Sequence, residues 1–269
     1  MGEILQDGML RMLLTRLIET REAPLAAAVA RADCYLVGSY AHGRADSGSD
    51  VDIFAFTPDE TGIVGTQVPF APSGPRPGPG RSLATLAAVR SWRAAAGAGN
   101  VEIQFIGPKE RSRRETDLAN WAFMLDSARL LHSGWGEGEA YRAAVADQFK
   151  HDHQHLAMEA LVEFQRCRNQ AQTTLLHGEP VAVVLTAAMA ARAALRAWLL
   201  WAGCPLPNEK WLPAVAATQP GAEQLLVVVT RMVAGDRSSE ERFEDARTLR
   251  DLMIDHVRRA GGDPEPLWV

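Results

Sequence analysis

Residues 35–56, YLVGSYAHGRADSGSDVDIFAF, constrain the fold more than any other part of the chain. Residues 34–37 and 50–56 are short apolar runs bounded by glycine, serine or aspartate, which predicts two β-strands. The dipeptide Gly38-Ser39 follows the first run directly and indicates a tight turn. Two strands so close together in the sequence require a sheet in this part of the chain.

Further strand and helix signals surround this segment. Residues 101–106, VEIQFI, alternate with the period of two that is typical of a half-buried strand. Apolar residues at helical spacing predict a helix over residues 5–18, and Pro24 suits the first turn of a second, short helix. Residues 69–80, PFAPSGPRPGPG, predict a long loop, and residues 83–96 predict another helix. The first part of the chain is therefore expected to be an α+β domain.

The second half of the chain consists mostly of helix formers. Proline- and glycine-containing turns divide it into four expected helices, over residues 140–176, 181–202, 221–233 and 239–260. A glycine-rich turn at residues 133–138 precedes them. We therefore predict two domains, an α+β domain at residues 1–138 and an up-and-down helical bundle at residues 139–269.

Two aspartates stand at the start of the second predicted strand. Asp50 and Asp52 are two residues apart, so in a strand their side chains point the same way, about 6.6 Å apart along its axis. Such a pair suits Mg²⁺, which usually takes one or two protein carboxylates together with water and phosphate oxygens. Gly38 lets the backbone approach a phosphate, and the Ser39 hydroxyl can donate to phosphate oxygens. The pattern predicts a site for magnesium and phosphate.

The spacing of these residues resembles the motif of polymerase-beta-type nucleotidyltransferases, which is Gly-Ser, three residues, Gly, five residues, then Ser-Asp-x-Asp. The matching positions, without a gap, are Gly38, Ser39, Gly43, Ser49, Asp50 and Asp52. The resemblance implies a mixed sheet with flanking helices that carries a site for two Mg²⁺ ions. It also implies transfer of a nucleoside monophosphate from a nucleoside triphosphate, expected here to be ATP, with Gly38, Ser39 and Ser49 contacting the nucleotide.

The family has a third carboxylate on a neighbouring strand, and Glu102 matches it as the acidic position of the alternating strand. The resemblance implies that Asp50 and Asp52 bridge the two metal ions. Glu102 would bind the second metal ion, deprotonate the acceptor hydroxyl, or do both. The sequence leaves these roles of Glu102 open.

An α+β domain followed by a helical bundle resembles the antibiotic adenylyltransferases that act on kanamycin, other aminoglycosides and lincosamides. In that group the bundle supplies the acceptor pocket, often across a dimer interface, which implies a small-molecule hydroxyl acceptor and allows a homodimer. A lysine before an aromatic residue reaches the triphosphate in these enzymes, and Lys210, before Trp211, is the matching candidate. Arg44, inside the motif, is a second candidate for a phosphate contact.

Other functions stay open on sequence grounds. The protein could nucleotidylate a macromolecule, either protein or tRNA, as part of a toxin–antitoxin system, or it could bind nucleotide without turnover. Arg250 and His256 have a spacing that resembles a toxin ribonuclease family, in which an arginine and a histidine act on an RNA phosphodiester. Glu159 and Glu163, four residues apart on a predicted helix, either meet an amine-rich acceptor or form a solvated surface.

Charge and composition limit the partners and the compartment. The chain has 28 Lys and Arg against 33 Asp and Glu, a net charge of -5, which disfavours an extended nucleic-acid surface. Residues 181–202 are long enough to span a membrane, but Arg192 and Arg196 within them favour a buried bundle helix. Cysteines without paired spacing and an N-terminus without a signal-peptide pattern favour a cytoplasmic protein without a membrane partner.

Overall fold

The structure is a computed structural model, and its chain divides into two compact units, residues 1–145 and 146–269. The long helix α7 (Gly138–His177) begins in the first unit and continues into the second. The structure describes residues 8, 10–12, 14, 15, 18, 19, 23–45, 49–61, 66–68, 101–177, 180–234 and 236–265.

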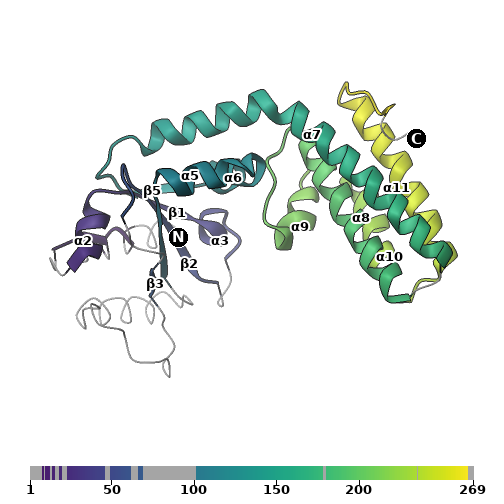
Figure 1. Ribbon diagram of the computed structural model, residues 1–269, viewed down its shortest axis with the longest axis horizontal. Helices are drawn as coiled ribbons and strands as arrows, with labels where there is room; N and C mark the ends of the chain where they lie inside the picture. The colour runs from purple at the N-terminus through teal and green to yellow at the C-terminus, as the bar shows by residue number, and fades with distance from the viewer. Residues whose placement is uncertain are drawn as a thin grey trace. The chain divides into compact units, whose positions relative to one another are not determined.

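The first unit contains a sheet of five strands in the order β3-β4-β2-β1-β5. Figure 1 shows this sheet with β1, β2, β3 and β5 labelled. Its strands are β1 (Asp33–Val37), β2 (Val51–Phe56), β3 (Thr66–Val68), β4 (Val101–Ile106) and β5 (Arg129–His132). β2 and β4 are parallel, whereas the other neighbouring pairs are antiparallel. The sheet is therefore mixed, which confirms the predicted fold class.

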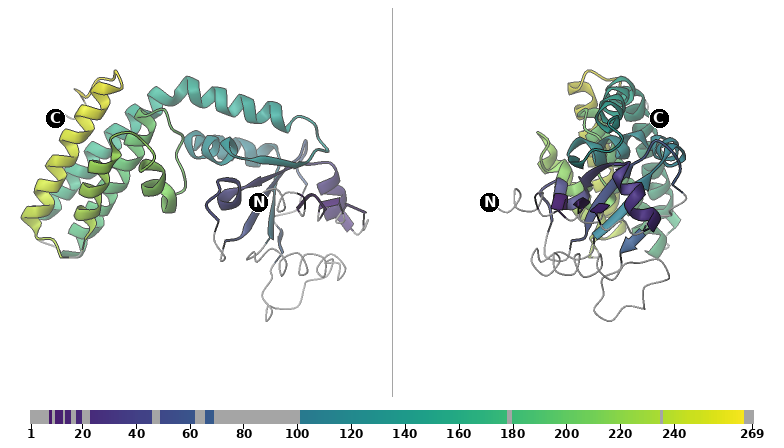
Figure 2. Two further views of the ribbon diagram at one scale, coloured as in Figure 1. Left: turned by 180° about the vertical axis from the view of Figure 1, so that it is seen from behind. Right: turned by 90° about the vertical axis from the view of Figure 1, so that its left-hand side faces the viewer.

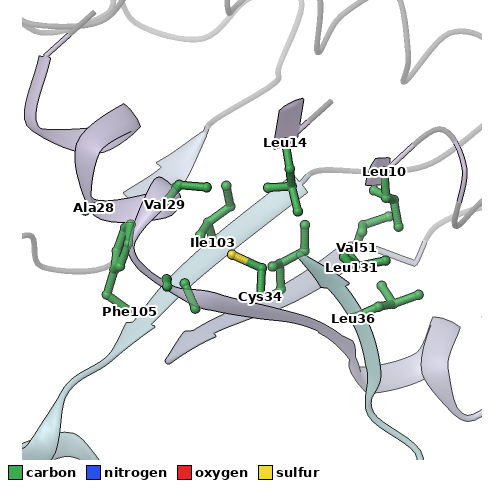
Figure 3. Close-up of a cluster of buried hydrophobic side chains, with 13 residues drawn as sticks. Leu10, Leu14, Ala28, Val29, Cys34, Leu36, Val51, Ile103, Phe105 and Leu131 are labelled. Carbon is green, nitrogen blue, oxygen red and sulfur yellow. The ribbon is translucent and has the colours of Figure 1, made fainter. Parts of the chain in front are cut away.

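One face of the sheet packs against helices from the start of the chain (Figure 3). Leu36 on β1 and Ile103 on β4 point to this face, and α2 (Ala23–Ala30) covers it with Val29. Leu10 and Leu14, both in helical conformation, pack onto the same cluster. Because successive side chains of a strand point to opposite faces of the sheet, the neighbours of these strand residues lie on the other face.

The opposite face of the sheet is covered by α5 (Pro108–Glu115) and α6 (Leu118–Asp126). The rings of Phe54 and Phe56 lie 5.5 and 6.0 Å from the ring of Trp121 on α6. The Arg114 guanidinium on α5 lies 4.8 Å from the Phe54 ring and donates to the Gln104 side chain at 2.8 Å. Because Gln104 and Phe54 follow Glu102 and Asp52 by two residues, these carboxylates share this face.

The second unit is helical, and its helices run beside one another (Figures 1 and 2). α8, α10 and α11 contribute buried apolar side chains to its core, for example Trp198, Leu225 and Met253. A capping box joins Ser238 and Glu241 at the start of α11. The remaining elements are α8 (Pro180–Trp201), η1 (Glu209–Trp211), α9 (Leu212–Ala216), α10 (Ala222–Val233) and α11 (Ser239–Arg259).

The predicted strands and the long helices of the bundle are confirmed, but several short elements were not predicted. These elements are β3, β5, α5 and α6. The predicted loop at residues 69–80 and helix at residues 83–96 lie outside the described residues.

Within the described residues, Val181–Trp201 is the one helix long and apolar enough to cross a membrane. Two thirds of the apolar window, 67%, is buried inside the protein, as in the core helix of a bundle. This burial agrees with the interpretation of the segment as a bundle helix.

Candidate active site

The register of three strands brings predicted site residues together. Val37 on β1 pairs with Asp52 on β2, and Asp52 pairs with Glu102 on β4. Neighbouring strands lie about 4.8 Å apart, and paired residues project to the same face of a sheet. Asp52 and Glu102 are therefore adjacent carboxylates on the face covered by α5 and α6, and both are half-buried.

Asp50 is placed differently from the sequence-based expectation. β2 begins at Val51, so Asp50 lies one residue before the strand and is exposed, and strand geometry does not align it with Asp52. Among the described residues, no group of three or more His, Cys, Asp or Glu side chains is arranged to hold a metal ion. The structure thus brings two of the three predicted carboxylates together but does not assemble all three.

The residues present nevertheless fit a divalent metal ion. Two neighbouring carboxylates are what Mg²⁺ usually takes from a protein when phosphate and water complete its shell.

Gly38 packs directly against Asp52. It is the first residue of α3 (Gly38–Ala41), a single helical turn after β1, and has a φ of 70°. A Cβ at this position would overlap Oδ2 of Asp52. The absence of a side chain therefore lets the turn that carries Ser39 reach the carboxylate. Ser39 itself is 8% exposed.

Hydrogen bonds hold the turn of residues 38–44 in shape. The Arg44 N–H donates to the Ser39 carbonyl at 2.8 Å, and the His42 N–H donates to the Gly38 carbonyl at 3.1 Å. Arg129 on β5 donates to the Tyr40 carbonyl at 3.3 Å. The proposed phosphate contacts of Arg44, which is exposed, and Ser49, which is half-buried, stay predictions.

Lys210 lies in the second unit, within η1, and its side chain is exposed. Its Nζ is 5.2 Å from the centre of the Trp211 ring, within reach of a cation–π contact. The neighbouring Glu209 accepts from Nε of Arg192 at 2.6 Å, which attaches η1 to α8. A triphosphate contact of Lys210 stays a prediction.

The paired glutamates of α7 have partners within the helical unit. Glu159 lies 3.3 Å from His155, and Glu163 lies 3.9 Å from Arg192. These contacts are at the protein surface, where ion pairs contribute little to stability. The acceptor-binding interpretation of Glu159 and Glu163 also stays a prediction.

His256 has a structural position. It is 9% exposed, its ring stacks on Trp198 at 3.6 Å, and its Nε2 lies 3.0 Å from the Trp198 carbonyl oxygen. Burial lowers the pKa of His256, although the hydrogen bond to Trp198 opposes this effect. A histidine enclosed in this way is poorly placed to act on an RNA phosphodiester, which argues against the ribonuclease interpretation.

Comparison with known proteins identifies the family of the first unit. Residues 20–119 match the family model described as a nucleotidyltransferase domain. No curated protein matches the chain. A similar solved structure is a nucleotidyltransferase-like protein from Exiguobacterium sibiricum, with a TM-score of 0.49 and 10% identity, covering 95% of this chain and 77% of that chain.

The matched segment contains the whole motif from Gly38 to Asp52 and also Glu102. The first unit therefore carries a nucleotidyltransferase domain of the polymerase-beta superfamily, as the motif predicted. The protein is a transferase of the nucleotidyltransferase type, EC 2.7.7. Domains of this family generally use nucleoside triphosphates and divalent metal ions.

Replacing Gly38 with alanine is expected to impair nucleotide binding. The substitution puts a Cβ against the Asp52 carboxylate and forces an L-residue into the left-handed region, which alone costs about 1 kcal/mol. We expect at least about a tenfold rise in the Kd for Mg·ATP, measured by calorimetry.

Gly136→Ala is the matched control, because Gly136 has a φ of 86° and a Cβ there would meet nothing within 4 Å. It should carry a similar backbone strain and leave the Kd unchanged. Wild-type affinity in Gly38→Ala would contradict the role given to the contact between Gly38 and Asp52.

Proposed function

We propose that the protein is a magnesium-dependent adenylyltransferase that transfers AMP from ATP to a hydroxyl group of a small molecule. The observation that supports this most strongly is the register of Asp52 with Glu102, with Gly38 packed against Asp52. This arrangement joins two carboxylates that would suit a metal ion to a turn on which a phosphate could approach the backbone.

In this proposal, Asp50, Asp52 and Glu102 would hold magnesium, with two ions expected. When bound, magnesium would neutralise charge on the triphosphate and lower the pKa of the acceptor hydroxyl. Asp52 would be the central ligand, a role supported by its position between the Gly38 turn and Glu102.

The side chains of this site would orient the nucleotide and accept a proton. The Ser39 hydroxyl and the N–H groups of its turn would donate to phosphate oxygens. The acceptor oxygen then attacks the α-phosphorus, and the bond from that phosphorus to the β-phosphate oxygen breaks to release pyrophosphate. Glu102, which lies beside Asp52, would take the hydroxyl proton.

The acceptor proposed is an antibiotic of the aminoglycoside or lincosamide kind. The helical unit supports this choice, since it presents Glu159 and Glu163 on one face of α7, where carboxylates would suit an amine-bearing ligand. The net charge of -5 favours a small acceptor over an extended nucleic acid. A cytoplasmic location and a homodimer belong to the same proposal.

The test is a transfer assay with α-labelled ATP and Mg²⁺, run separately with an antibiotic panel, bulk tRNA and a protein extract. Label in a small-molecule product is the expected result. Label in tRNA or protein would instead support a macromolecular acceptor, and nucleotide binding without transfer would indicate a non-catalytic module. GTP, CTP and UTP in parallel reactions determine the preference for a base.

A further inference from the structure

His42 connects the turn beside Asp52 to helix α6. It lies within the motif segment GSYAHG, and its half-buried ring stacks on Phe123, with ring centres 4.3 Å apart and planes inclined by 12°. Phe123 is buried on α6. Stacked aromatic pairs contribute to stability beyond the area they bury, so this contact ties the turn to a rigid element.

The backbone of His42 is part of the same turn. Its N–H donates to the carbonyl of Gly38, and Gly38 is the residue that packs against Asp52. Two residues later, the Arg44 N–H closes the turn on the Ser39 carbonyl. A shift of the His42 ring would therefore move the backbone on both sides of Ser39.

The imidazole is expected to be neutral at pH 7. Burial lowers the pKa of His42, and Arg44 lowers it further, whereas Asp126 on α6 raises it. The stack with Phe123 is then a contact between two uncharged rings, which a phenylalanine at position 42 can reproduce.

We propose that His42 is a positioning residue for the triphosphate, acting through its stack on Phe123 to hold the turn of residues 38–44 beside Asp52. The proposal rests on the proposed function, because it assumes that this turn receives the phosphates of the nucleotide. Its distinctive feature is that the stack of the His42 ring on Phe123 carries the effect.

The experiment compares His42→Ala with His42→Phe by two measurements, the Kd for Mg·ATP and the hydrogen exchange rate of the Arg44 amide. His42→Ala should raise the Kd by about tenfold and speed exchange of this amide, because the turn loses its anchor. His42→Phe keeps the stack and should restore both values to within about twofold of wild type.

Val29→Ala is the stability control, because Val29 is fully buried on the opposite face of the sheet and its truncation destabilises the same unit. It should lower the melting temperature without changing either measurement. The proposal is overturned if His42→Ala leaves both values unchanged, if Val29→Ala reproduces its effects, or if His42→Phe fails to rescue them.

Failure of the proposed function gives a different result. In that case the wild-type protein binds no Mg·ATP. The exchange rate of the Arg44 amide in His42→Ala and His42→Phe still shows whether the ring of His42 holds the turn.

Discussion

Asp52→Asn is expected to reduce pyrophosphate release by about 10²- to 10³-fold, the range seen when one preorganised electrostatic group is removed from an active site. Asparagine has nearly the same shape but no charge, so it is a weaker ligand for the metal ion and leaves the triphosphate charge less well balanced. Pyrophosphate release in the presence of Mg·ATP and the acceptor found in the transfer assay measures the effect.

The same substitution should leave the fold intact. Asp52 is half-buried, and its strand register with Val37 and Glu102 does not depend on the carboxylate. Like charges on directly opposite strand residues are destabilising, so the free energy of unfolding should be unchanged or should rise by up to about 1 kcal/mol.

Asp59→Asn is the matched control, because it makes the same chemical change at an exposed residue just beyond the other end of β2. It should retain full activity. Wild-type turnover in Asp52→Asn would remove Asp52 from the reaction and with it the main support for the proposed mechanism.

The central strands could be predicted because their sequence signals are local. Residues 101–106 alternate apolar and polar side chains, and the resulting strand β4 has the predicted bounds. β5 (Arg129–His132) could not be predicted in the same way, since a four-residue run after a helix has too little pattern to separate strand from helix. Its place at the sheet edge comes from pairing with β1, a contact distant in sequence.

The candidate site was predictable as a set of residues but not as an arrangement. Motif spacing indicated Asp52, and the acidic position of an alternating strand indicated Glu102. Only the parallel pairing of β2 and β4 shows that the two residues are directly in register. The stack of His42 on Phe123 had no sequence signal, because the two rings are far apart in the chain and either could be an ordinary apolar contact.

Asp33 shows most clearly what sequence could not reveal. It begins β1, is 1% exposed, and accepts hydrogen bonds from the Ser133 hydroxyl and from backbone N–H groups around the start of α7. Those backbone donors, at 2.7 to 3.0 Å, belong to Gly134, Trp135, Gly136 and Gly138. The sequence predicts a domain boundary at the glycine-rich turn of residues 133–138, and the structure shows that this turn also encloses a buried carboxylate.

Asp33→Asn is expected to lower the free energy of unfolding of the first unit by about 3 kcal/mol or more. The buried amide lacks the negative charge, and its NH₂ group would face N–H donors that lose their acceptor. Urea denaturation followed by fluorescence measures the loss, since Trp135 lies in the affected turn. Asp147→Asn is the control, because Asp147 is a largely exposed partner of Lys150 and its loss should cost less than about 1 kcal/mol.

The stabilising effect of Asp33 should depend on pH in a defined direction. Burial by itself raises the pKa of Asp33, but the hydrogen bonds from Gly136, Gly138, Ser133 and Trp135 outweigh it and hold the pKa below its ordinary value. The contribution is therefore fully present above the unfolded-state pKa, about 3.9, and is lost as the pH falls through the lower folded-state value. The stability difference between wild type and Asp33→Asn should be constant from pH 7 to about pH 5 and shrink below about pH 4. A difference that instead grew on acidification would show that the pKa of Asp33 is higher in the folded than in the unfolded protein, which would contradict the stabilisation of its charged form by these hydrogen bonds.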